Sequence, residues 1–162
     1  MSAKTFKTSI DLATKTRTAV VALLNQQLAD TSDLYTQTKQ AHWNVKGPQF
    51  IALHELFDEL AGELLDHIDT MAERITALGG YAMGTVRMAA ATSRLPEYPT
   101  DVFGGMETVG VLVERYAALA KSTREAIDAA DQASDADTAD LFTGVSRFLD
   151  KSLWFLEAHL QA

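Results

Sequence analysis

Four side chains of the types that bind metal ions lie within twenty residues in the middle of the sequence: His54, Asp58, Asp69 and Glu73. Imidazole and carboxylate groups are common ligands of divalent metal ions in proteins. The first two residues are four apart, and so are the last two. Because an α-helix has about 3.6 residues per turn, each pair shares one face if the segment is helical. The spacing therefore predicts two pairs of metal ligands on one helix.

The two pairs cannot serve one ion within one chain. Asp58 and Asp69 are eleven residues apart, which on a helix is roughly 16 Å at about 1.5 Å per residue. Bonds from a metal ion to its ligands are only about 2 Å long. The spacing is symmetric about a point between Glu63 and Leu64, so an antiparallel second copy would bring His54 and Asp58 opposite Glu73 and Asp69. The sequence predicts two equivalent metal sites shared across a symmetric dimer.

Four long helices account for most of the sequence. Hydrophobic residues recur at helical spacing from about 9 to 39, from 48 to 78, after 101, and from about 137 onward. The three prolines, Pro48, Pro96 and Pro99, all lie at expected helix boundaries, and Gly79 and Gly80 end the second helix. Residues 79–102 form a long connection with a short helix expected at 86–91. We predict an all-α four-helix bundle with a long crossover between helices two and three.

Composition narrows the class of protein. The 162 residues predict a single domain, 1–162, with a sizeable core. There is no cysteine, so disulfides and cysteine-based metal sites are excluded. No apolar run is long enough to span a membrane, and the first residues lack the apolar core of a secretory signal, so we expect a cytoplasmic protein. The net charge of −8 disfavours a nucleic-acid-binding body and is compatible with handling cations.

The middle of the chain resembles a known family. The segments that carry the resemblance are AHWN, GPQFIALHE, DHIDTMAER and ALGG, with LPEYPTD, DTADLFT and LDKSLWFLE further on. They resemble the Dps family, the DNA-binding proteins from starved cells, which are mini-ferritins of the ferritin-like superfamily. The resemblance covers about residues 18–160. It implies a ferroxidase site between two subunits, formed by His42 together with His54, Asp58, Asp69 and Glu73.

The resemblance also implies a function. Members of this family form hollow dodecamers that oxidise Fe(II), preferentially with hydrogen peroxide rather than dioxygen, and store ferric mineral, which protects DNA. We therefore expect a ferroxidase that binds iron at two inter-subunit sites per dimer, where zinc or other divalent metals can substitute. Trp43 is expected near the site, where its indole could intercept one-electron by-products. Asp135 and Asp140 match acids that line iron-entry pores; the alternative is a solvated loop in which Asp137 or Thr138 caps the last helix.

The N-terminal tail, residues 1–8, supports a second function. Residues 1–17 contain Lys4, Lys7, Lys15 and Arg17 against one acid, Asp11. Many copies of a flexible basic tail on a shell could bind DNA, which would make the protein a nucleoid-binding structural protein. We expect instead that a helix begins near Ser9, leaving Lys4 and Lys7 free and DNA binding weak.

Overall fold

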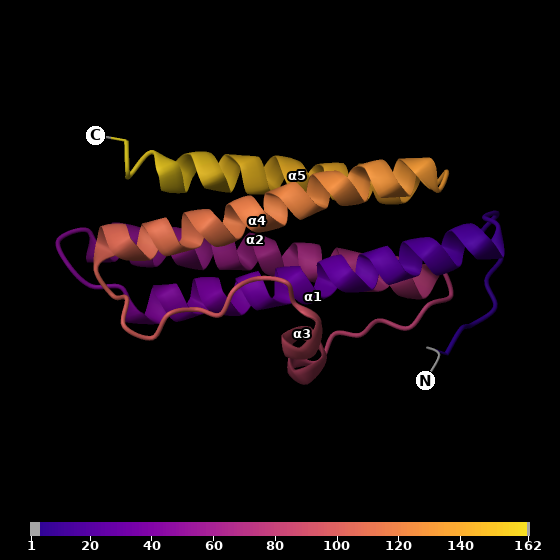
Figure 1. The fold of residues 1–162 in the computed structure, drawn as a ribbon, viewed down its shortest axis with the longest axis horizontal. Coiled ribbons are helices and arrows are strands. Elements are labelled where there is room, and N and C mark those ends of the chain that lie inside the picture. The colour runs from indigo at the N-terminus through magenta and orange to yellow at the C-terminus, as the bar shows by residue number, and fades with distance from the viewer. Residues whose placement is uncertain (1–3, 162) are drawn as a thin grey trace.

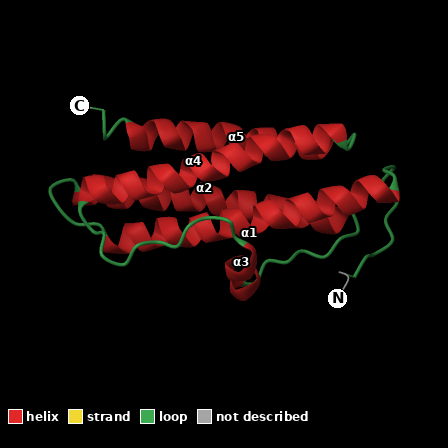
Figure 2. Cartoon of the chain, in the orientation of Figure 1, coloured by secondary structure: helices red, strands yellow, loops and turns green. Residues whose placement is uncertain are grey.

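The computed structural model describes residues 4–161 and shows five helices. They are α1 (Thr14–Asn44), α2 (Phe50–Ala77), α3 (Val86–Thr92), α4 (Gly105–Gln132) and α5 (Ala136–Glu157). Residues 4–161 contain no β-sheet, only an isolated bridge between Lys46 and Gly104 (Figure 2). The all-α prediction is confirmed, including the short helix in the crossover.

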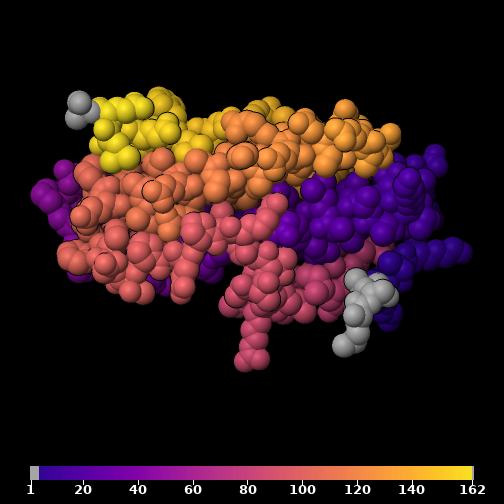
Figure 3. Space-filling model, viewed as in Figure 1, coloured from indigo at the N-terminus to yellow at the C-terminus, as the bar shows by residue number. Residues whose placement is uncertain are grey.

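The four long helices form two antiparallel hairpins packed side by side (Figure 1). One hairpin is α1 with α2, and the other is α4 with α5. The crossover leaves the end of α2, passes along the outer side of α1 and reaches the start of α4 at the opposite end of the bundle. Its helix α3 packs against α1 and protrudes from the surface in Figure 3. A connection of this length lets α2 and α4 run in the same direction.

The core consists of two hydrophobic clusters, one in each half of the bundle. In the half that holds the end of α1 and the start of α2, the larger cluster includes Leu34, Phe57, Leu112, Tyr116 and Leu149. The cluster in the other half includes Leu24, Leu28, Met71, Ile75 and Phe142. Every one of these residues is buried. Each half therefore has its own packed interior, and the larger one supports the α1–α2 contact where His42, His54 and Asp58 lie.

Polar side chains fasten the crossover to the bundle. Asp30 is 1% exposed, and both of its carboxylate oxygens bind Arg94, at 2.6 Å from Nη2 and 2.7 Å from the backbone amide. Arg115 on α4 donates to the carbonyl of Glu97 at 3.0 Å. Because a buried carboxylate is costly to leave unpaired, Asp30 fixes the path of the crossover across α1.

The first helix begins later than the sequence suggested. It starts at Thr14 after Ala13, not near Ser9, and ends at Asn44 rather than near residue 39. The segment before it lies against the end of α2, where the Phe6 amide donates to the Gly79 carbonyl at 2.7 Å. Arg17 donates to the carbonyls of Leu12 and Leu78. These tertiary hydrogen bonds hold the chain before Thr14 in a non-helical path.

No helix in the described part of the chain combines the length and apolarity that crossing a membrane requires.

Candidate metal centre

Two histidines hold the end of α1 against the start of α2. Nδ1 of His42 lies 2.7 Å from the carbonyl oxygen of His54, and Nδ1 of His54 lies 2.8 Å from the carbonyl oxygen of His42. The rings stack with their centroids 3.8 Å apart and their planes 17° apart. A carbonyl oxygen can only accept, so each Nδ1 carries the proton. In the neutral form of each ring, Nε2 is then the nitrogen with the free lone pair, and it is the one that can bind a metal ion.

Asp58 lies beside the two imidazoles. It lies one turn beyond His54 on α2, and its Oδ1 is 3.9 Å from Nε2 of His42. Its side chain is 58% exposed. The hydrogen bond from Lys39 is the main cause that lowers the pKa of Asp58. Desolvation opposes it, and the charge of Lys39 and the two imidazoles add smaller effects in the lowering direction. Asp58 is therefore an anion available at the surface beside two fixed imidazoles.

Asp69 and Glu73 lie apart from these three donors in the single chain. Both are exposed on the second half of α2. Among residues 4–161, no three acidic or imidazole side chains are arranged to hold a metal ion by themselves. The structure thus brings together His42, His54 and Asp58 and leaves Asp69 and Glu73 at the far end of the same helix. The shared site across a dimer stays a prediction.

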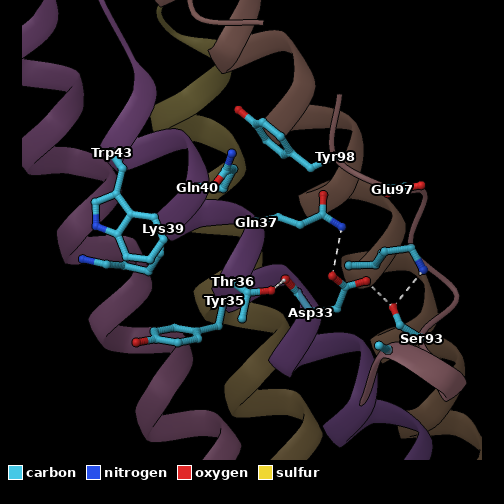
Figure 4. A pocket seen from close by; sticks show the side chains of 12 residues that line it. Asp33, Tyr35, Thr36, Gln37, Lys39, Gln40, Trp43, Ser93, Glu97 and Tyr98 are labelled. Atoms are coloured by element: carbon cyan, nitrogen blue, oxygen red, sulfur yellow. Dashed lines mark hydrogen bonds between the residues drawn. The ribbon is translucent and has the colours of Figure 1, made fainter. Parts of the chain in front are cut away.

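Lys39 is a neighbour of this group that the sequence reasoning missed. Its ammonium nitrogen is 2.5 Å from Oδ1 of Asp58 and 5.8 Å from the ring centroid of Trp43. Trp43 is 64% exposed and lies at the edge of a groove of about 720 Å³ between α1 and the crossover. Figure 4 shows the indole and the Lys39 side chain next to each other. The only signal in the sequence was that Lys39 precedes His42 by three residues, about one helical turn.

The residues considered for a pore have different surroundings. Asp135 is 2% exposed and is the N-cap of α5, so neither Asp137 nor Thr138 is the cap as predicted. Its carboxylate accepts from the Thr138 amide at 3.1 Å and from Arg74 at 2.8 Å. Asp140 is exposed. In the single chain Asp135 therefore has a structural task, whereas Asp140 is free to face a pore; the pore itself stays a prediction.

The basic residues proposed for DNA binding are accessible. Lys4 and Lys7 are exposed, with the ammonium of Lys4 5.2 Å from the ring centroid of Phe6. Phe6 itself is tied to Gly79 through its backbone. Residues 1–3 of the predicted tail lie outside the described residues.

Known proteins share both the fold and the sequence. A family model described as a ferritin-like domain matches residues 21–162. The DNA protection during starvation protein of Agrobacterium fabrum is 51% identical over 158 residues, covering 98% of each chain. The chain belongs to the Dps family of mini-ferritins.

Solved Dps structures agree over nearly the whole length of the chain. A Dps protein from Bacillus brevis has a TM-score of 0.86 at 37% identity, covering 93% of this chain and all of the other. The Dps protein of Vibrio cholerae O1, described as a member of a broad superfamily of ferritin-like diiron-carboxylate proteins, has a TM-score of 0.89 at 28% identity and covers 99% of both chains. The resemblance noted in the sequence is thereby confirmed as family membership.

Proposed function

We propose that this Dps protein oxidises Fe(II), preferentially with hydrogen peroxide, and stores the ferric product inside a hollow dodecamer. The observation that carries the proposal is the pair of imidazoles whose Nδ1 atoms are both bound to carbonyls, next to an ionised Asp58. Two neutral nitrogens and a carboxylate form a donor set that suits Fe(II), the substrate. Asp69 and Glu73 of a second copy would complete each site, giving two sites per dimer.

The residues have distinct tasks in this reaction. The Nδ1 atoms are bound to carbonyls, which fixes the orientation of both rings and leaves Nε2 of each neutral imidazole as the donor to Fe(II). The carboxylates supply negative charge that favours the ferric product over the ferrous substrate. Two Fe(II) ions each give one electron to hydrogen peroxide, whose O–O bond breaks, and two protons from solvent complete two water molecules. Trp43 beside the site is an oxidisable side chain that could trap a one-electron product.

Protection of DNA follows from this chemistry. Removing Fe(II) and peroxide together prevents them from reacting elsewhere to form radicals, which agrees with the name of the Agrobacterium fabrum relative, DNA protection during starvation protein. The second candidate function is direct DNA binding through the tail. Lys4 and Lys7 are exposed, but a shell with a charge of −8 per chain repels phosphate. We propose weak DNA binding at most.

Stopped-flow oxidation of Fe(II) tests the proposal. Asp58→Asn and His54→Gln should slow oxidation by about tenfold or more, since even residues that only support metal ligands often contribute that much. Glu125→Gln, which changes an exposed acid on α4, is the control and should retain the wild-type rate. Light scattering must show that all variants assemble alike. Wild-type rates in an assembled Asp58→Asn variant would refute the site, and faster oxidation by dioxygen than by peroxide would refute the oxidant preference.

A further inference from the structure

A leucine and a glycine lie between the two predicted ligand pairs on α2. Leu65 is 50% exposed, and Gly62, three residues before it, is exposed as well. Residues three apart are neighbours on one face of a helix. The two positions are symmetric about the point between Glu63 and Leu64, which is also the point about which the ligand pairs are symmetric. The centre of this face therefore combines a projecting apolar side chain with a position that has none.

The fold of the single chain does not require glycine at position 62. Gly62 lies in the middle of α2 (Phe50–Ala77), where a glycine destabilises a helix relative to alanine. Its backbone is helical, so no positive φ calls for glycine. Apart from its neighbours and the backbone of the surrounding helix, no atom of residues 4–161 would lie within 4 Å of a Cβ at this position. The open space leaves room for another chain to approach α2 closely.

A second copy of the same helix fits this face. If two α2 helices run antiparallel about the centre of symmetry, Leu65 of each copy lies opposite Gly62 of the other. Because the arrangement is two-fold symmetric, the contact forms twice and needs no other partner. Leu65 also borders a largely apolar hollow of about 250 Å³ with Ile68 and Val86, which extends the same surface towards the crossover.

The separation of the two helices decides whether the ligand pairs can share an ion. Asp58 and Asp69 have short side chains, and bonds from a metal ion to a carboxylate oxygen are about 2.0–2.2 Å long. Packed helices have axes about 8–10 Å apart, and the side chains at the contact set the distance within that range. Large side chains at both 62 and 65 would hold the helices apart, whereas leucine against glycine lets them approach. The same contact favours one register, because a shift along the helix would place Leu65 against another side chain.

We propose that Leu65 and Gly62 form a two-fold contact between copies that sets the separation and the register of the paired α2 helices. Both are positioning residues, since they act on the metal ion only through the placement of the ligands. The acidic ligands on the same face repel one another across the axis, so this apolar contact supplies attraction at its centre. The inference rests on the proposed function, because it specifies how the copies meet at the shared site.

Exchanging the two residues tests the contact directly. Gly62→Leu sets leucine against leucine across the axis, and it should lower the Zn(II) affinity of the metal-free protein by about tenfold or more, as the loss of supporting residues at metal sites often does. Leu65→Gly should lower the affinity too, because the helices lose the apolar contact. The double variant again places a leucine opposite a glycine, so isothermal titration should return an affinity within about threefold of wild type.

Gly110→Leu provides the matched control. Gly110 is also a glycine inside a helix, with open space around a Cβ at its position, but it lies on α4. This variant should change the Zn(II) affinity by less than about twofold. Gly62→Leu raises helix propensity, so weaker binding in that variant cannot come from a weaker helix. Light scattering of every variant records assembly and should show the same rescue in the double variant.

The outcomes separate the two proposals. Wild-type affinity and assembly in Gly62→Leu would overturn the contact and leave the proposed function intact. So would a double variant that binds Zn(II) as weakly as the single variants, or a Gly110→Leu variant that loses as much affinity as Gly62→Leu. Failure of the wild type to bind Zn(II) or Fe(II) would refute the proposed function, whereas the light-scattering series would still decide whether Leu65 and Gly62 meet across copies.

Discussion

The ion pair between Arg74 and Asp135 should be a main support of the α2–α5 contact. The Asp135 side chain is 2% exposed and the Arg74 side chain 16% exposed, and their nearest atoms are 2.8 Å apart. Removing one partner of a buried pair typically costs about 3–5 kcal/mol. Asp135 would still accept hydrogen bonds from the amide and hydroxyl of Thr138, which lowers the expected cost of Arg74→Met to about 2–3 kcal/mol.

Thermal unfolding at constant protein concentration tests this prediction. For a chain of this length, 1 kcal/mol corresponds to a change in Tm of about 2–4 °C, so Arg74→Met should lower Tm by roughly 5–10 °C. Asp135→Asn keeps an acceptor that caps a helix well and should cost only about 1 kcal/mol. The double variant should be more stable than Arg74→Met alone, because it leaves no unpaired buried charge. Strictly additive losses in the double variant would show that the pair is not the reason for the stability.

Three further predictions concern other contacts. Gly79→Ala should destabilise the fold by about 1–3 kcal/mol in chemical denaturation, because Gly79 has φ of 78° and a Cβ there would lie against the Phe6 carbonyl oxygen; an unchanged midpoint would contradict this. Burial beside Phe148 lowers the pKa of His67 despite the nearby Glu63 and Asp66, so the unfolded chain binds the proton more readily and stability should fall as pH drops below about 6.5. His67→Gln should reduce that dependence. Leu65, 50% exposed between the two ligand pairs, should contact the second copy, so Leu65→Glu should shift light scattering toward smaller species; a normal assembly would exclude this face.

The number and order of the long helices could be predicted from the sequence because they depend on the spacing of neighbouring residues. Apolar spacing and the positions of Pro48 and Gly79 were sufficient to define the four long helices and the crossover. The start of α1 was wrong because the hydrogen bonds that hold residues 6–13 outside the helix involve Gly79 and Leu78, which are more than sixty residues away in the sequence. Local propensity at Ser9 contains no information about such contacts.

In the candidate site, too, spacing along one helix was predictable from the sequence and contacts between helices were not. Spacing along one helix predicted His54 and Asp58 as ligands, whereas His42 was proposed only through the resemblance to a family. The stacking of His42 on His54 and the approach of Lys39 to Asp58 depend on how α1 packs against α2. The resemblance to a family predicted a pore role for Asp135, but its burial beside Arg74 could only be seen in three dimensions.

The reciprocal hydrogen bonds between His42 and His54 make folding and ligand placement a single event. Each imidazole orients itself by binding the backbone of the other histidine, so both rings lose their rotational freedom when α1 docks on α2. At the proposed metal site, an arriving ion would meet nitrogens that need no further ordering, which favours rapid capture at low concentration. Because each acceptor is a backbone carbonyl, replacing one histidine removes its own ring and the stacking contact but leaves the carbonyl that orients the other imidazole.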